Sequence, residues 1–246
     1  QCKNEIHNIL QRANIKLTSY LSDIYGITGI TLLEMFIDGE VITEQTILPK
    51  IHGKVKATAA ELVEAMDGKL SFEDRFLLGQ SLEHYRHSVN QVEEITVVIK
   101  QYVLERFERE YNLLIELPGV SAIVACVILS EIGPNVEAFK SQGNLASWAG
   151  VCPGSYESAG IKKSSHTTQG NKYLKSILFQ AGGTAGRSKD EAFHNLYARI
   201  SGRSSKMKAI IACAHKMIRV IYKILNTGEH YDAKKALGLR QQARAN

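Results

Sequence analysis

Residues 150–174 contain the side chains of this chain that are best suited to chemistry on a phosphodiester. They place Ser158 in a polar loop that becomes basic at Lys162 and Lys163. A serine hydroxyl can attack phosphorus when a base removes its proton, and nearby cations stabilise the negative charge that develops there. The segment therefore predicts a candidate nucleophile, Ser158, in a cationic loop.

Residue type alone does not distinguish Ser158 from its neighbours. Three other serines share the loop: Ser155, Ser164 and Ser165. His166 could accept the proton of the hydroxyl, or Lys162 and Lys163 could stabilise charge on a pentavalent phosphorus instead. Both alternatives stay open.

Helical periodicity surrounds this loop on both sides. Apolar residues recur every three to four positions along most of the chain, and Gly and Pro separate the periodic stretches. The pattern predicts a mostly α fold, without internal repeats, that ends in a frayed tail after Gly228. Helices are expected over residues 3–25, 31–36, 57–66, 71–115, 122–132, 136–149, 171–181, 190–200 and 207–225.

The longest expected helix, residues 71–115, has a heptad-like apolar seam. Its apolar and aromatic residues follow each other at steps of three or four. Such a seam can pack on the helix's own domain, or it can pair two protomers as a coiled coil, which is the reading we favour. The seam consists of Leu78, Leu82, Tyr85, Val89, Val92, Ile95, Ile99 and Tyr102.

A helix-hairpin-helix signature follows directly. The turn Leu117–Val120 separates two helical stretches, and Gly119 allows the backbone to approach a ligand closely. Amides at the start of the next helix could then hold a DNA phosphate without reading sequence. Pro-Gly turns are also common between helices, and residues 117–157 carry 1 Lys/Arg against 3 Asp/Glu, so a purely structural turn stays an alternative.

Positive charge is concentrated in the last third of the chain. Residues 158–246 carry 17 Lys/Arg and 4 Asp/Glu, a net charge of +13, whereas residues 1–116 carry 12 and 18, a net charge of −6. This asymmetry favours a nucleic-acid partner over a merely solvated basic face. The cations expected to contact nucleic-acid backbones are Lys162, Lys163, Lys172, Lys175, Arg203 and Lys206.

Other classes of function find less support in the sequence. No apolar run is long enough to span a bilayer and no signal peptide opens the chain, so we expect a cytoplasmic, nucleoid-associated protein without a membrane partner. The four cysteines and eight histidines show no CxxC or HxxxH spacing. We therefore expect no metal site or cofactor within this chain, and no two-metal nuclease built from it alone.

A long ordered set of residues carries a family resemblance: Leu117–Val120, Ala125, Glu131–Gly133, Phe139, Leu145–Gly150, Cys152–Gly154, Glu157–Gly160, Gly170, Asn171, Leu174, Ala214 and His215. From residue 117 to residue 232 the chain resembles the C-terminal domain of transposases of the insertion sequence one-ten family, particularly its eleven-eleven subgroup. The residues before this segment resemble the family's helical, coiled-coil linker.

The resemblance implies an RNA-guided DNA recombinase. The family's nucleophile lies in a Glu-Ser-Ala-Gly motif, which corresponds to Ser158 here, and would form a transient phosphoserine link with DNA. A guide RNA of the element would select the DNA. The family also has an N-terminal domain with four acidic, Mg²⁺-binding residues, which we expect to lie outside these 246 residues, leaving this fragment inactive alone. Ile161 stands where the family usually has a basic residue, and Lys162 could take over that contact.

We therefore expect a helical linker region over residues 1–70, a coiled-coil helix over 71–116, a serine transposase domain over 117–232 and a flexible tail over 233–246. The first hypothesis is that the chain is this portion of a DNA transposase, an enzyme with Ser158 as nucleophile that assembles as a homo-oligomer. The alternative is a non-catalytic helix-hairpin-helix module that binds DNA or RNA. A purely structural dimerisation domain would leave the basic C-terminal third unexplained.

Overall fold

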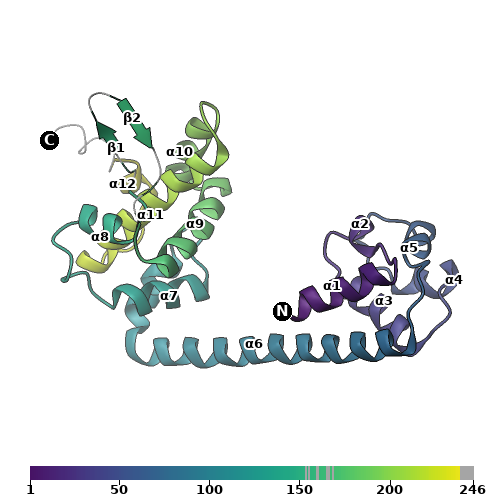
Figure 1. The fold of residues 1–246 in the computed structure, drawn as a ribbon. Coiled ribbons are helices and arrows are strands. Elements are labelled where there is room, and N and C mark those ends of the chain that lie inside the picture. The colour runs from purple at the N-terminus through teal and green to yellow at the C-terminus, as the bar shows by residue number, and fades with distance from the viewer. Residues whose placement is uncertain (153, 155, 159–160, 165–166, 168, 239–246) are drawn as a thin grey trace. The chain divides into compact units, whose positions relative to one another are not determined.

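The computed structural model describes residues 1–152, 154, 156–158, 161–164, 167 and 169–238, with backbone alone for 156–158 and 161–164. This part of the chain is mostly helical and contains one two-stranded sheet (Figure 1), which confirms the predicted fold class. The chain divides into two compact units, residues 1–94 and 95–246. The long helix α6, Phe72–Ile115, contributes residues to both units.

The N-terminal unit consists of short helices around an aliphatic core. They are α1 (Cys2–Arg12), α2 (Leu17–Tyr20), α3 (Ile27–Asp38), α4 (Glu44–Ile47), the 3-10 helix η1 (Leu48–Lys50) and α5 (Ala59–Ala65). The single helix predicted over residues 3–25 is interrupted, because Asn14 adopts a left-handed φ of 57°. The chain then turns so that the amide of Lys16 donates to the carbonyl of Ala65 at 2.7 Å.

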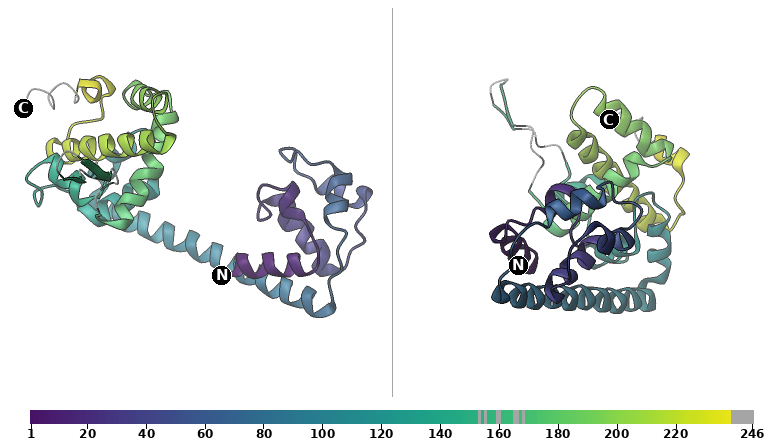
Figure 2. Two further views of the ribbon diagram at one scale, coloured as in Figure 1. Left: turned by 45° about the horizontal axis from the view of Figure 1, so that its top comes forward. Right: turned by 90° about the vertical axis from the view of Figure 1, so that its right-hand side faces the viewer.

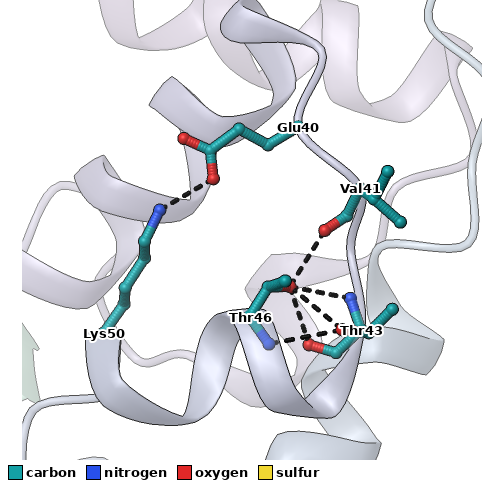
Figure 3. Close-up of polar contacts among 5 residues, drawn as sticks. All are labelled: Glu40, Val41, Thr43, Thr46 and Lys50. Carbon is teal, nitrogen blue, oxygen red and sulfur yellow. Dashed lines mark hydrogen bonds and ion pairs between the residues drawn. The ribbon is translucent and has the colours of Figure 1, made fainter.

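Local polar contacts order the connection between α3 and α5 (Figure 3). The hydroxyl of Thr43 accepts from the amide of Thr46 at 3.3 Å, and the hydroxyl of Thr46 accepts from the amide of Thr43 at 2.9 Å. This reciprocal pair caps the start of α4. Lys50 forms an ion pair with Glu40 at 2.8 Å. None of the residues predicted to bind or cleave nucleic acid lies in this unit.

The apolar seam of α6 has two different environments. Leu78 and Leu82 are buried in the core of the N-terminal unit, as expected for a helix that packs on its own domain. Val92 and Ile95 are 65% and 58% exposed, so the second part of the seam presents apolar surface. The helical backbone breaks at Phe107 (φ −139°, ψ 35°), which packs against the core of the C-terminal unit.

The C-terminal unit contains the remaining elements. They are α7 (Ala122–Ile132), α8 (Gln142–Trp148), β1 (Tyr156–Ser158), β2 (Ile161–Ser164), α9 (Lys172–Arg187), α10 (Glu191–Ser201), α11 (Lys206–Thr227) and α12 (Ala233–Gly238). Helices α9, α10 and α11 pack against one another (Figures 1 and 2). Helices α9 and α11 approach closely at Gly182, where an added Cβ would lie 2.7 Å from the nitrogen of Ala214. Helix α11 also packs on α8 and α10 and contributes many buried residues to the core of this unit.

Two parts of this unit differ from the expectation drawn from sequence. The segment around Ser158, expected as a loop, contains β1 and β2, which are too short to produce a period-two signal. Residues 233–238, expected in the tail, form α12 because Ala236 is buried against the core; the rest of the expected tail, residues 239–246, lies outside the described residues. The predicted boundaries at residues 70, 116 and 232 stay predictions.

Each helix in the described part of the chain lacks either the length or the hydropathy that a bilayer span requires.

Candidate nucleic-acid interface and serine hairpin

Ser158 is the last residue of the first strand in an antiparallel hairpin. It pairs with Ile161, and the preceding residue, Glu157, pairs with Lys162. Residues 159–160, which connect the strands, lie outside the described residues. The hairpin therefore places the candidate nucleophile at the end of a strand, beside the connection, where sequence reasoning expected only a polar loop.

The hairpin also carries two of the predicted cations. Lys162 and Lys163 both lie on β2, so the backbone of the candidate nucleophile and of two candidate phosphate ligands belong to one small sheet. The side chains of Ser158, Lys162 and Lys163, and the whole of His166, lie outside the described part of the chain. Their predicted roles therefore stay predictions.

The two ends of the segment that carries the hairpin are held against each other. The amide of Asn171 donates to the carbonyl of Trp148 at 3.0 Å. An added Cβ at Gly170 would lie 2.4 Å from the nitrogen of Gly150, which itself has a left-handed φ of 70°. Side chains larger than hydrogen do not fit at Gly170 without movement of the backbone. We call these four residues the hairpin base.

Asn171 joins the hairpin base to two helices. Its Oδ1 accepts from the amides of Tyr173 at 3.0 Å and Leu174 at 2.9 Å, which caps the start of α9. Its Nδ2 donates to the carboxylate of Glu131 in α7. Asn171 and Glu131 were both part of the sequence resemblance, but their separation in sequence gave no sign that they meet. The contact fixes the base of the hairpin relative to α7 and α9.

Four further predicted cations lie at the starts of helices or just before them. Lys172 is exposed in the first turn of α9, with its ammonium 4.9 Å from the ring centre of Tyr173, and Lys175 follows one turn later. Lys206 is the first residue of α11, and Arg203 precedes it. Cations near a helix N-terminus oppose the helix dipole, and a bound phosphate would relieve this unfavourable interaction.

Gly119 lies in the turn between α6 and α7 with a φ of 82°. Its Cα packs on α9, because an added Cβ would lie 2.3 Å from the carbonyl oxygen of Ala181. Ser121 caps α7 by accepting from the amide of Val124 at 3.4 Å. The helix, turn and helix expected from sequence are present. The close packing on α9 explains why a glycine is needed at position 119. Phosphate binding at Gly119 stays a prediction.

A cavity of about 670 Å³, which we call the α11 cavity, is lined by residues of α10, α11 and α12. Val151 and Thr167, on either side of the hairpin, also line it. Its basic and titratable residues are Arg199, Lys208, His215, Lys216 and Arg219, and its lining within the described chain includes no Asp or Glu. From the sequence, several of these cations were expected to lie off the apolar stripe of α11, but no cavity was expected. The signal that could have indicated the cavity is the helical spacing of residues 208, 215 and 219.

Hydrogen bonds hold these cations in place without neutralising them. Lys216 donates to the carbonyl of Ala192 at 2.9 Å, and Nε of Arg219 donates to the side-chain oxygen of Gln142 at 3.2 Å. Nε of Arg199 is buried and has no hydrogen-bond partner in the part of the chain that the structure describes. None of the ion pairs found among the described residues involves a cation of this cavity.

The protonation of two residues reflects this environment. Burial lowers the pKa of His215, and the charge of Arg219 lowers that pKa further. Burial also lowers the pKa of Lys216, although the charge of Asp190 acts in the opposite direction. The α11 cavity is therefore electropositive and partly desolvated, which strengthens its attraction for an anion.

The hairpin base lies inside a segment that matches a family of known proteins. Residues 111–198 match the model of the transposase IS116/IS110/IS902 family. The chain is 31% identical over 157 residues to a Sinorhizobium fredii protein named as a transposase, y4pF/y4sB, an alignment that covers 61% of this chain and 39% of that protein.

Two further relatives come from different organisms. The insertion element IS110 protein of Streptomyces coelicolor is 28% identical over 133 residues, which are 53% of this chain and 32% of the relative. The pilin gene-inverting protein of Moraxella lacunata is 27% identical over 158 residues, which are 62% of this chain and 48% of the relative. The aligned segments therefore span less than half the length of each of these three relatives.

Proposed function

We propose that this chain is part of a DNA recombinase in which Ser158 is the nucleophile, because residues 111–198 match the model of the IS116/IS110/IS902 transposase family. The observation that carries the proposal is the position of Ser158 at the end of β1, within the matched segment. The hairpin base, at the ends of the segment that carries this strand, is tied to α7 and α9 through Asn171. A hairpin supported in this way can present a hydroxyl to a DNA strand.

The proposed step is a transesterification at phosphorus. Oγ of Ser158 bonds to the phosphorus of a DNA phosphodiester while the bond from phosphorus to one sugar oxygen breaks. The serine proton passes to a base, and the departing sugar oxygen takes up a proton. A sugar hydroxyl of another strand then attacks the phosphoserine and releases Ser158. The covalent link conserves the phosphoester, so the two reactions need no nucleotide cofactor.

The cations provide the electrostatic part of the proposal. Lys162 and Lys163 lie on the strand that pairs with β1, where they could stabilise charge on the reacting phosphate. Lys172, Lys175, Arg203 and Lys206 would hold DNA or guide-RNA backbones. The net charge of +13 over residues 158–246 supports this assignment, because phosphate contacts dominate nucleic-acid affinity.

The remainder of the recombinase is also part of the proposal. The relatives are more than twice as long as the segments aligned here, and we propose that the whole protein includes an N-terminal acidic, Mg²⁺-binding domain, as in the eleven-eleven subgroup. Among the described residues, no three His, Cys, Asp or Glu side chains gather as metal ligands would.

Self-association completes the proposed assembly. The exposed second part of the α6 seam, including Val92, Ile95 and Ile99, is apolar surface that a second copy of the helix could cover. One relative is named for inversion of a pilin gene. An inversion cuts and rejoins DNA strands, and we propose the same class of reaction for this protein, guided by an RNA of its element.

The proposal is tested by trapping the covalent intermediate. The full-length recombinase that contains this chain is incubated with labelled element-end DNA and guide RNA, then denatured and separated by electrophoresis. We expect a protein–DNA adduct that is lost in Ser158→Ala and kept in Ser164→Ala, a matched serine of the same hairpin. Unchanged DNA binding by Ser158→Ala supports a chemical role. An adduct of equal yield in Ser158→Ala would remove Ser158 from the reaction, and the absence of any adduct would favour a binding module.

A further inference from the structure

The α11 cavity has the size and the apolar lining of a site for a small organic group. Its volume of about 670 Å³ falls within the range of about 300–1,000 Å³ that is typical of ligand pockets. Apolar side chains make up one part of the lining: Ala192, Leu196, Ile200, Ile211, Ala212 and Leu237. These side chains could exclude water from the faces of a flat, weakly polar group.

Cations make up the other part of the lining. Nε of Arg199 is buried without a hydrogen-bond partner among the described residues, while the half-buried Arg199 side chain lines the cavity, where its other N–H groups could donate to an anionic oxygen. Lys208 is exposed at the edge of the cavity, where a charged ligand would first meet it. Lys216 and Arg219 are held by neutral oxygen atoms of Ala192 and Gln142, so their charges are not cancelled.

The cavity also adjoins the serine hairpin. Val151 follows Gly150 of the hairpin base, and Thr167 precedes Gly170 by three residues, so residues at both ends of the hairpin segment line the cavity. A nucleic-acid strand that reaches the hairpin is thus brought to the α11 cavity as well. This link between the two features depends on the proposed function, whereas the chemistry of the cavity does not.

We propose that the α11 cavity binds one unstacked nucleotide of a single-stranded DNA or RNA segment. Its base occupies the apolar part, beside Leu196 and Ile211, and its phosphate accepts from Arg199 and from a lysine at the edge. Burial of the base offsets the free energy lost on unstacking it. Holding a nucleotide next to the hairpin fixes the register of the strand that Ser158 attacks.

A nucleotide explains both parts of the lining together. Inorganic phosphate would satisfy the cations but leave the apolar side chains in contact with water. An apolar ligand would cover those side chains but offer no acceptor to the cations of the lining. A nucleotide carries a π-face and an anion on one flexible frame, so it matches both parts.

The test uses this chain with single-stranded DNA and RNA oligonucleotides of one sequence, each carrying the fluorescent base 2-aminopurine, whose emission rises when it is unstacked. We expect a rise on binding to the parent protein. Ala212→Phe fills the cavity and should abolish the rise and weaken binding about tenfold, equivalent to about 1.4 kcal/mol. Strands with abasic sites should bind the parent about as weakly as intact strands bind Ala212→Phe.

A charge pair provides a second readout that does not depend on the folding of Ala212→Phe. Lys208→Gln and Lys189→Gln each remove one exposed lysine, but only Lys208 lines the α11 cavity. Lys208→Gln should weaken binding of intact strands severalfold more than Lys189→Gln.

The outcomes separate this proposal from the one on Ser158. A rise with DNA alone, with RNA alone or with both supports the nucleotide site and identifies its strand. Equal binding of intact and abasic strands together with no rise in emission overturns it, as does equal binding by the two lysine variants. Loss of the covalent adduct in the recombinase would not change any of these results, because they measure binding alone.

Discussion

Asn171 donates a hydrogen bond from Nδ2 to the carboxylate of Glu131, forty residues earlier in the chain. The same side chain caps α9 through its Oδ1. One side-chain amide therefore accepts hydrogen bonds from the free backbone N–H groups of the first turn of α9 and also ties this turn to α7. It does so at the point where the hairpin segment rejoins the helical core. Both halves of the amide are used, so neither Asp nor Ser can replace it completely.

The first prediction separates these two functions of the amide. Asn171→Asp keeps an oxygen that caps α9, but it replaces the donor and places two carboxylates against each other. We expect the free energy of unfolding to fall by about 1–3 kcal/mol, because a part-buried hydrogen bond is lost and like charges face each other. Urea denaturation at neutral pH measures the change.

A second substitution provides the control. Glu131→Gln in the Asn171→Asp background restores a donor opposite the new carboxylate and removes one charge. The double variant should recover most of the lost stability, with a coupling energy that exceeds the error of the measurement. Additive losses in the double-mutant cycle would mean that the two side chains do not interact in solution.

The second prediction concerns the backbone crossing in the hairpin base. Ala at Gly170 would place Cβ 2.4 Å from the nitrogen of Gly150, so Gly170→Ala should lower stability by about 1–3 kcal/mol through steric overlap. Gly143 in α8 is the matched control, since the nearest atom to its added Cβ is 3.6 Å away. Gly143→Ala should raise stability by about 0.5–1 kcal/mol. Thermal unfolding of the two variants should shift in opposite directions, and equal shifts would contradict the close crossing.

The helices were more predictable than the hairpin for a physical reason. Residues 122–132 were expected to form a helix and do so, because a continuous apolar pattern ends at a glycine that cannot extend it easily. Strands β1 and β2 have three and four residues, which is too short for alternation to be distinguished from a loop. The long helix 71–115 was also found, but its break at Phe107 depends on packing in the C-terminal unit that no local pattern encodes.

The sequence singled out the residues of the candidate site, whose roles stay predictions, but it gave no geometry for them. The family resemblance included Glu131, Gly170, Asn171 and Ser158. Helical periodicity, however, gives no information on contacts between residues that lie forty positions apart. The α11 cavity was missed for the same reason, because Arg199 and Arg219 come from different helices and line one cavity only after α10 packs on α11.

The third prediction concerns the salt dependence of nucleic-acid binding. If Lys172 and Lys206 each contact a phosphate, replacing either one by Gln should make the slope of the logarithm of the binding constant against the logarithm of the salt concentration less negative by about 1. Lys54, an exposed lysine of the N-terminal unit, is the control and should leave the slope unchanged. Titrations of the parent and the three variants at several salt concentrations measure this. A parent slope near zero would argue against a phosphate-binding surface altogether.

The fourth prediction tests the second part of the α6 seam. Ile99 lies on the seam and is 42% exposed, whereas Val97 is 65% exposed and lies on the opposite side of the helix. Ile99→Asp should weaken self-association at least about tenfold, because it places a charge in an apolar helix interface. Val97→Asp should leave the oligomeric state unchanged. Sedimentation velocity over a range of protein concentrations distinguishes the two. A parent chain that stays monomeric throughout would exclude pairing through this seam.

The fifth prediction follows from the buried imidazole of His215. Burial and the nearby Arg219 lower its pKa in the folded protein from 6.5, so the unfolded chain binds the proton more readily. The associated stability is fully present above about pH 6.5 and is lost as the pH falls through that value toward the lower pKa of the folded state. His215→Gln should therefore make the free energy of unfolding less dependent on pH below 6.5 than it is in the parent. Denaturation of the parent and the variant between pH 5 and 8 measures this, and parallel pH profiles for parent and His215→Gln would show that the folded protein binds this proton as easily as the unfolded chain does.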